Sequence, residues 1–338
     1  MSAQNADLNG KPTVISTFAG CGGSSLGYKM AGFNELLAVE WDNNAVETFK
    51  LNFPGVKVYH GDISKLSSKE CMELAGISVG ELDVFDGSPP CQGFSTAGKR
   101  RYGDPRNSLF KEFARLLKDI QPKVFVMENV TGMIKGHMKQ AYLTIIKTLR
   151  ECGYRCKGQV LNAMYYNVPQ KRERVIIIGV RNDLNIEPSH PKPESKPINV
   201  REAFGGLNED EDNRMVSGFL VEYAKKHPKD SWNTDGEIYK KIKGNLAGSI
   251  STKWCSWNKT CGTLPKSEIS TTGIIHPDKK RYLSLSEMKR IASFPDDFKF
   301  IDRKSGVNRI GNSVPPNLMK AIALHIKNNI LSKTQQSE

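Results

Sequence analysis

The sequence predicts an α/β protein with a doubly wound, mostly parallel sheet and a second, smaller domain that is irregular and β-leaning. Over roughly the first 180 residues, short apolar runs alternate with helical patterns, as in a sheet covered by helices on both sides. Near Asn182 the composition changes, and the chain stays rich in Pro, Gly, Asn, Lys and Ser to about His276. We therefore expect one domain over 1–185, a second over 186–276, and a return to the first over 277–338.

The expected strands of the first domain are short runs rich in Val, Ile, Leu, Phe and Met, namely Val14 to Phe18, Leu36 to Val39, Val56 to Tyr59, Val84 to Phe85, Val124 to Met127 and Val175 to Val180. Asp42 can cap the helix after the second strand, and Pro54-Gly55 ends that helix. A later helix has one apolar face, formed by Leu109, Phe113, Leu116, Leu117 and Ile120. The last helix begins at Pro315-Pro316 and places Leu318, Ile322, Ile326 and Ile330 on one face. That face needs a core to cover, so we expect the helix to pack on the first domain.

The charge balance favours a polyanionic partner. Lys and Arg exceed Asp and Glu by 13, and the pI is about 9.3; nucleic acid is the first candidate and an anionic membrane the second. No run of about 18 apolar residues exists, and the start lacks an apolar signal core, so we expect a cytoplasmic protein without a membrane span. The seven cysteines indicate reduced thiols, and their spacing predicts no metal site.

A glycine-rich loop follows the first strand directly, in the segment Phe18-Ala19-Gly20-Cys21-Gly22-Gly23. Glycines let a backbone approach a ligand closely, although a structural tight turn explains the loop about equally well on its own. Glu40 and Asp62 end the second and third strands, where carboxylates can bind a ribose or an adenine. Ser25 replaces the third glycine of the dinucleotide fingerprint, which disfavours NAD and leaves room for S-adenosylmethionine.

A candidate nucleophile follows the fourth strand, where ligands bind in a doubly wound sheet. The segment Asp86-Gly87-Ser88-Pro89-Pro90-Cys91 holds a cysteine behind two stiff prolines. Enzymes that methylate an exocyclic amine resemble this site but carry an aromatic residue after Pro-Pro. Here the residue after Pro-Pro is Cys91. A cysteine in that place suits methylation of carbon 5 of cytosine, which is a poor nucleophile and needs a thiolate on carbon 6 to gain electron density.

These motifs resemble those of the DNA cytosine carbon-5 methyltransferases, of the single-chain bacterial or phage type, across nearly the whole chain. The similar segments, in the family's order, are Phe-Ala-Gly-Cys-Gly-Gly at 18–23, Pro-Cys-Gln at 90–92, Glu-Asn-Val at 128–130, Gln-Lys-Arg-Glu-Arg at 170–174, the Arg281 to Phe294 segment, and Gly-Asn-Ser-Val at 311–314. The resemblance implies the fold of S-adenosylmethionine-dependent methyltransferases and methyl transfer to carbon 5 of cytosine.

The resemblance also implies the roles of single residues. Cys91 would attack carbon 6, Glu128 would contact N3 and the amino group of cytosine, and Arg174 and Arg172 would hold the base's carbonyl oxygen or orient Glu128. A structural ion pair is the alternative for either arginine. Gln92 and Ser95 lie in the loop expected to close over DNA. The cofactor contacts expected are Phe18, Ala19, Gly20, Cys21, Gly22, Gly23, Leu26, Glu40, Trp41, Asp62, Ile63, Gly87, Pro89, Leu109, Asn312, Ser313 and Val314. Core packing explains Leu109 equally well.

The expected partner is double-stranded DNA, from which the target base must be extruded. The expected DNA contacts are Lys99, Arg100, Arg101, Arg106, Thr263 and Leu264, with a solvated basic loop as the alternative for the charges. We expect a monomer, with a restriction endonuclease as a possible separate partner. Three other functions compete: methylation of transfer RNA, a non-catalytic DNA-binding protein, and a nicotinamide oxidoreductase, which the broken glycine fingerprint disfavours.

Overall fold

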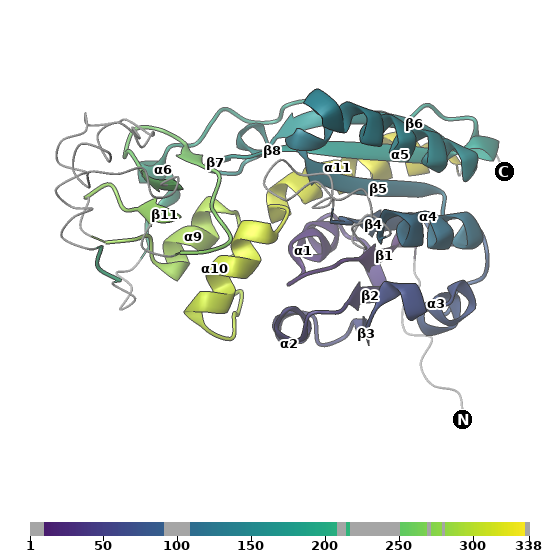
Figure 1. Ribbon diagram of the computed structural model, residues 1–338, viewed down its shortest axis with the longest axis horizontal. Coiled ribbons are helices and arrows are strands. Elements are labelled where there is room, and N and C mark those ends of the chain that lie inside the picture. Colours follow the sequence, from purple (N-terminus) through teal and green to yellow (C-terminus); the bar gives the residue numbers. More distant parts are fainter. Residues whose placement is uncertain are drawn as a thin grey trace.

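The computed structural model describes residues 10–90, 109–207, 214–216, 251–268, 272–278 and 281–334. Figure 1 shows two parts, a larger one built on a sheet and a smaller one that carries short strands and helices. The strands are β1 (Thr13–Thr17), β2 (Asn34–Glu40), β3 (Lys57–His60), β4 (Val84–Gly87), β5 (Val124–Val130), β6 (Tyr154–Asn162), β7 (Gln170–Lys171), β8 (Glu173–Arg181), β9 (Ser251–Trp254), β10 (Cys261–Gly262) and β11 (Thr272–Ile275).

The α-helices are α1 (Gly23–Met30), α2 (Asn43–Asn52), α3 (Ser68–Ala75), α4 (Leu109–Ile120), α5 (Lys139–Glu151), α6 (Val200–Ala203), α9 (Leu285–Ile291), α10 (Arg303–Asn312), α11 (Pro316–Ile326) and α12 (Ser332–Thr334). Short 3-10 turns are η1 (Ile63–Lys65), η4 (Thr131–Ile134), η5 (Gly136–Met138), η6 (Ala163–Tyr165) and η7 (Asn182–Leu184), and η8 (Lys327–Leu331) is a π-helix.

The central sheet has the strand order β3-β2-β1-β4-β5-β8-β6. Its members from β3 to β5 run parallel, whereas β8 is antiparallel to both β5 and β6. The order reverses between β1 and β4, which is the position where ligands bind in open α/β sheets. The predicted doubly wound, mostly parallel sheet is confirmed.

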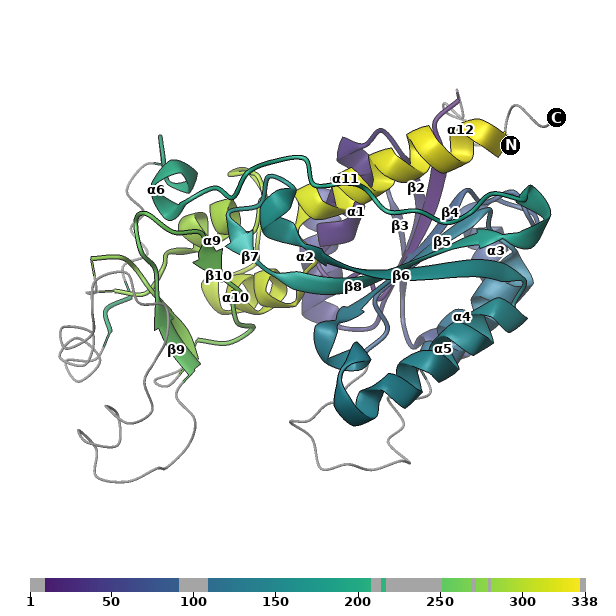
Figure 2. The same ribbon diagram turned by 90° about the horizontal axis from the view of Figure 1, so that it is seen from above.

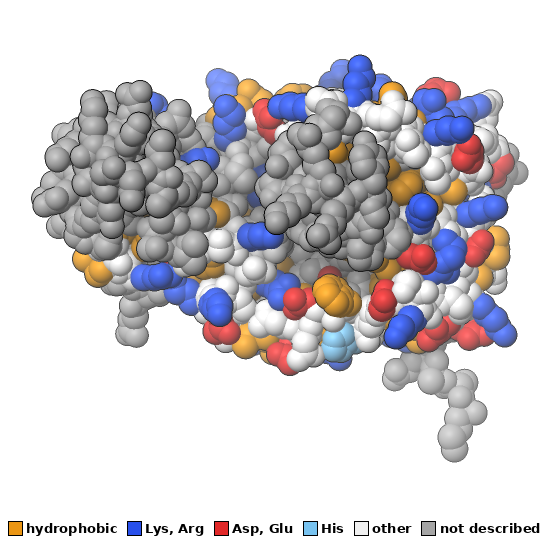
Figure 3. Space-filling view, in the orientation of Figure 1, with side chains coloured by type: hydrophobic (Ala, Val, Ile, Leu, Met, Phe, Trp, Pro, Cys, Tyr) orange, Lys and Arg blue, Asp and Glu red, His pale blue; other side chains and the backbone are white. Residues whose placement is uncertain are grey.

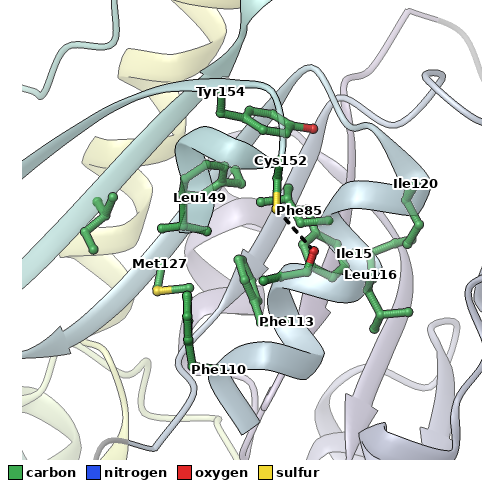
Figure 4. Close-up of a cluster of buried hydrophobic side chains, with 14 of the residues drawn as sticks. Ile15, Phe85, Phe110, Phe113, Leu116, Ile120, Met127, Leu149, Cys152 and Tyr154 are labelled. Carbon is green, nitrogen blue, oxygen red and sulfur yellow. Dashed lines mark hydrogen bonds between the residues drawn. The ribbon is translucent and has the colours of Figure 1, made fainter. Parts of the chain in front are cut away.

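One face of the sheet is covered by α3, α4 and α5. Phe113 and Leu116 of α4 are fully buried against Phe85 of β4, and the rings of Phe85 and Phe113 lie 4.9 Å apart. Figure 4 shows these side chains in one buried cluster with Met127 and Leu149. The apolar face predicted for 109–120 therefore forms the core on this side.

The other face is covered by α1 and α11. Tyr28 of α1 and Leu318 and Ile322 of α11 are fully buried in one cluster with Val14 and Val84. A Cβ added to Gly27 would lie 2.5 Å from Met319 Cβ, so the helices touch at that glycine. The predicted packing of the last helix on the sheet is confirmed, and Figure 2 shows α11 running beside α1 over the strands.

The smaller part contains two short parallel strand pairs, β7 with β10 and β9 with β11. Figures 1 and 2 place α6, α9 and α10 beside these strands, so the chain returns to the sheet only at α11. A third core cluster joins the two parts, since it contains Phe49 of α2 together with Leu264, Ile291 and Ile310. The domain boundaries at 186 and 277 stay predictions.

The described cysteines are all free. The Sγ atoms of Cys255 and Cys261 lie 3.4 Å apart in the third cluster, and Cys152 donates a hydrogen bond to Ala114 O. No group of His, Cys, Asp and Glu that could hold a metal ion occurs within the described ranges. In the same ranges, every helix is too short or too polar to cross a membrane. On the face seen in Figure 3, Lys and Arg side chains are interspersed with Asp and Glu side chains over the larger part.

Glu287 is the centre of the polar contacts that fix α9. It is 5% exposed, its Oε1 and Oε2 accept hydrogen bonds from Arg281 at 2.8 Å each, and its Oε2 also accepts the Ser284 N–H that completes a capping box. We expect Glu287→Ala to lower the free energy of unfolding by about 3–5 kcal/mol, because Arg281 would lose its partner in a buried pair. Glu70 is the matched control: it stands at the same position after the Ser67 cap of α3 but is exposed. Glu70→Ala should change stability by less than about 0.5 kcal/mol in urea denaturation; equal effects would contradict the role of the ion pair.

Candidate active site

A cavity of about 700 Å³ opens at the carboxyl edge of the parallel strands. It is formed by the loop after β1, the ends of β2, β4 and β5, the start of β8, the loop after β10, and the end of α10 with the segment that follows it. The predicted site residues that line it are Phe18, Ala19, Gly20, Cys21, Gly23, Glu40, Trp41, Pro89, Glu128, Arg172, Arg174, Asn312, Ser313 and Val314. Motifs that lie up to about 300 residues apart in the sequence thus meet in one cavity.

The glycine loop has a backbone that its sequence makes possible. Gly20 and Gly22 have φ of 58° and 93°, in the left-handed region that glycine adopts without strain. Glu40 fixes the loop from β2, because its Oε2 accepts the Gly20 N–H at 2.8 Å while its Oε1 accepts the N–H groups of Trp41 and Asp42 at 2.9 Å. Glu40 therefore organises the cavity wall, and Trp41 next to it is 76% exposed, an unusual exposure for a large aromatic side chain.

Gly23 lets the C-terminal segment approach the loop. A Cβ built on Gly23 would lie 2.6 Å from Val314 O and 2.9 Å from Ser313 Cβ. We expect Gly23→Ala to push 313–314 away from the loop, weakening binding of the methyl donor at least about tenfold and destabilising the fold by about 1–3 kcal/mol. Donor binding by calorimetry and thermal unfolding would check both effects. Gly55→Ala, where an added Cβ has no neighbour within 4 Å, is the control and should leave both unchanged; a Gly23 variant that binds like it would refute the close approach.

Glu128 and Arg174 form an ion pair in the cavity wall. The Nε of Arg174 lies 2.8 Å from Glu128 Oε1, and the two side chains are 13% and 12% exposed. The pair follows from the register of β5 and β8, in which Glu128 stands opposite Ile176 and Val130 opposite Arg174. The arginine thereby fixes one carboxyl oxygen and leaves the other available to the cavity.

Arg172 is buried beside this pair. It is 2% exposed, and its Nη2 donates to Gly311 O at 3.0 Å. Its buried Nε has no hydrogen-bond partner. Burial, and then the neighbouring charge of Arg174, lowers the pKa of Arg172 to about 9. A guanidinium that is short of a partner in a cavity wall fits a site that receives a polar ligand.

The loop that leads to position 91 is tied to the same wall. Asn129 Nδ2 donates to Pro89 O at 3.0 Å, and Pro90 lines the cavity. Cys91, Gln92 and Ser95 follow in the sequence but lie outside the described residues. Cys21 lines the cavity and is 1% exposed, and burial raises its thiol pKa to about 11. It is therefore a neutral thiol near pH 7, not a ready nucleophile.

Other predicted cofactor residues stand outside the cavity lining. Gly22 is the N-cap of α1, and Leu26 packs in the third core cluster. Ile63 and the half-buried Leu109 belong to the core under α3, α4 and α5. Asp62 is exposed and accepts the Ser64 N–H as the cap of η1. Gly87 is buried where a Cβ would collide with Phe113. Their contacts with a cofactor stay predictions.

The predicted DNA contacts fall into two groups. Lys99, Arg100, Arg101 and Arg106 lie outside the described residues. Thr263 is exposed, and its Oγ1 donates to Lys171 O at 2.8 Å. Leu264 is 1% exposed and packs in the third core cluster, so its side chain supports the fold, and its contact with DNA stays a prediction.

Two cations of the cavity wall were missed in the sequence. Arg309 of α10 pairs with Asp42 and donates from Nε to Asn44 Oδ1 at 3.0 Å, which joins α10 to the start of α2. Lys266 enters the wall from the smaller part. Neither belongs to a periodic pattern or to a quoted motif, so no sequence signal distinguished them from other surface charges.

The chain matches the family model of the C-5 cytosine-specific DNA methylases over residues 12–328. It is 36% identical to the type II methyltransferase M1.HphI of Haemophilus parahaemolyticus over 92% of this chain and 85% of that protein. It is 34% identical to M.DdeI of Desulfomicrobium norvegicum over 93% of this chain and 88% of that protein.

Solved structures agree with these matches. A prophage-encoded DNA modification methyltransferase from E. coli superposes with a TM-score of 0.72 at 27% identity, covering 94% of this chain and 99% of its own. The DNMT2 protein of Spodoptera frugiperda has the same fold, with a TM-score of 0.68 at 18% identity over 96% of this chain and 100% of its own. The chain belongs to the C-5 cytosine-specific DNA methylase family and is a DNA cytosine-5 methyltransferase.

Proposed function

We propose that Cys91 bonds transiently to carbon 6 of an extruded cytosine while Glu128 and Arg174 hold the base, in a sequence-specific modification of duplex DNA. The observation that carries this assignment is the Glu128–Arg174 pair, which lines the same cavity as the glycine loop and Pro90, the residue before Cys91. A carboxyl group in this position suits the N3 and amino group of cytosine, because hydrogen bonding at N3 makes carbon 6 more electrophilic.

The proposed methylation of carbon 5 begins with the thiolate of Cys91. The thiolate of Cys91 adds to carbon 6, and the electron pair of the 5,6 double bond moves onto carbon 5. S-adenosylmethionine, when bound, would supply an activated methyl group for that carbon, and its sulfur would keep the electron pair of the broken S–CH3 bond and leave as a neutral thioether. Loss of the carbon 5 proton to a base then restores the double bond and expels the thiolate. Arg174 keeps Glu128 oriented throughout, and the planar guanidinium suits that task.

The cavity fits S-adenosylmethionine by its donors and its shape. The exposed indole of Trp41 offers a stacking surface for an adenine, and Gly23 leaves room for the 312–314 segment to close the other end. Its volume of about 700 Å³ lies within the range of small-molecule sites. The two carboxyl oxygens of Glu40 accept hydrogen bonds from three backbone N–H groups. We therefore assign Glu40 first to shaping the loop and second to binding the ribose of the cofactor.

Methyl transfer from S-adenosylmethionine with a tritiated methyl group tests the function. Unmethylated plasmid DNA should become labelled, whereas bulk transfer RNA should not. A duplex containing 5-fluorocytosine at the target should trap a covalent complex that survives denaturation, because the fluorine cannot leave as a proton does. Labelling of RNA alone would reassign the substrate, and absence of both labelling and trapping would refute the proposal. Bisulfite sequencing of DNA from an expressing host would then give the recognised sequence.

We also propose that the protein protects host DNA from a restriction endonuclease. The relatives named above are type II methyltransferases, which supports a place beside a separately acting restriction endonuclease in the cytoplasm. A monomer is the form we expect on DNA. Comparison of host survival with and without the gene after introduction of a matching endonuclease would test the protective role.

A further inference from the structure

Lys266 stands apart from the other charged groups of the cavity wall. It enters from the loop after β10, whereas Glu128, Arg172 and Arg174 come from the central sheet or its approach. Its side chain is exposed, in contrast to the buried guanidinium of Arg172. The loop after β10 thus places one cation at the cavity where the sheet places the paired carboxyl group.

The backbone around Lys266 is held firmly. A Cβ on Gly311 would lie 2.5 Å from both N and Cα of Lys266, so the two backbones touch. Asn308 Nδ2 donates to Lys266 O at 3.2 Å. Two residues earlier, the Leu264 N–H donates to Gln170 Oε1 at 3.3 Å. The ammonium group therefore extends from a fixed point at the cavity, and it does not depend on a loose surface loop for its place.

Each of the other cations of the wall has at least one acceptor, although Arg172 keeps an unpaired Nε. Arg174 pairs with Glu128, Arg309 pairs with Asp42, and Arg172 donates to Gly311 O. Among the described cations that line the cavity, Lys266 is the one whose side chain is exposed and has no ion pair with a described carboxylate. An uncompensated ammonium at a cavity suits an anionic group that arrives with the ligand.

We propose that Lys266 binds a backbone phosphate next to the extruded cytosine and so holds that nucleotide at the cavity. The inference rests on the proposed function, since it takes DNA as the ligand. A nucleotide that leaves the duplex brings its own phosphates to the cavity, and each phosphate contact displaces a condensed counterion. The carboxylate of the methyl donor is the other anion that could reach the site. We favour the phosphate because Lys266 is exposed and comes from the same loop as Thr263, an exposed residue that the sequence predicts to contact DNA.

The salt dependence of DNA binding tests the assignment. Binding of the full chain to a linear plasmid fragment, with S-adenosylhomocysteine present, is measured from low to physiological salt. For Lys266→Ala we expect roughly tenfold weaker binding, and a plot of log K against log salt that is shallower by about one unit. Lys266→Arg should restore both. Lys147→Ala is the matched control: this lysine lies on α5, with a side chain 78% exposed, and its removal should leave the slope within error.

Donor binding separates the two anions. Calorimetric titration with S-adenosylmethionine should give the same Kd for wild type and Lys266→Ala. A weaker donor Kd together with an unchanged salt slope would assign Lys266 to the donor's carboxylate and overturn the proposal. An unchanged slope with an unchanged donor Kd would overturn it as well.

The proposed function and this inference fail separately. If the wild type labels no DNA, the methyl-transfer proposal falls, yet a slope reduced by about one unit in Lys266→Ala would still identify a phosphate ligand. If the wild type labels DNA and Lys266→Ala binds DNA with the wild-type slope, the inference alone falls.

Discussion

Alanine at position 91 should abolish methyl transfer to DNA, lowering kcat by at least about 10⁴-fold. Without the thiolate, carbon 5 of cytosine keeps its low electron density, because nothing adds to carbon 6. Cys21, which lines the cavity, cannot substitute, because burial raises its pKa to about 11 and leaves it as a neutral thiol. Transfer of a tritiated methyl group to plasmid DNA measures the loss directly.

The covalent complex gives a second readout for the same variant. Wild-type protein should form a denaturation-resistant complex with 5-fluorocytosine DNA, and Cys91→Ala should form none while it still binds the duplex. Cys156→Ala is the control, since Cys156 is a half-buried thiol of β6 at the edge of the sheet. A trapped complex with the Cys91 variant, or an equal loss in the Cys156 variant, would remove Cys91 from its role.

Much of the fold was predictable from local pattern. The spacing of apolar residues and the residues that begin or end helices located the strands from β1 to β5, the Asp42 cap and the apolar face of α4. Each of these depends on residues close in sequence. Strand direction did not follow in the same way. The run Val175 to Val180 reads as a buried strand whichever way it points, and only the long return through β6 makes β8 antiparallel to β5. The helices α9 and α10 were not among the helices that the sequence predicted.

The candidate site was predictable wherever a motif carried it. The glycine loop, Glu128, the two arginines and 312–314 line one cavity because α1 and α11 pack together and bring the ends of the chain to the same strand edge. Contacts made across the fold left no such trace. The Arg309–Asp42 pair links residues more than 260 apart in sequence, and the burial of Leu264, which was expected to contact DNA, depends on core residues distant in sequence.

Glutamine at position 128 should lower kcat for methyl transfer by roughly 10²–10⁴-fold, the range of a positioned acid–base group. The amide keeps the size of the side chain and an oxygen that can accept from Arg174 Nε, now 2.8 Å from the carboxyl oxygen. It cannot carry a proton to N3 of cytosine, so carbon 6 loses its activation while the wall keeps its shape. Steady-state kinetics on plasmid DNA would show the fall in kcat.

Binding measurements would show that the fall in kcat comes from the chemical step and not from weaker binding of DNA or S-adenosylmethionine. Kd values for DNA and for S-adenosylmethionine should remain within about threefold of wild type in Glu128→Gln, because neither ligand loses a packing contact. Glu173→Gln is the matched control: this glutamate adjoins Arg174 in β8, but its side chain is exposed and outside the cavity lining. It should keep wild-type kcat. Should Glu128→Gln turn over as fast as Glu173→Gln, the carboxyl group would serve only as the structural partner of Arg174, and activation of carbon 6 would have to come from another residue.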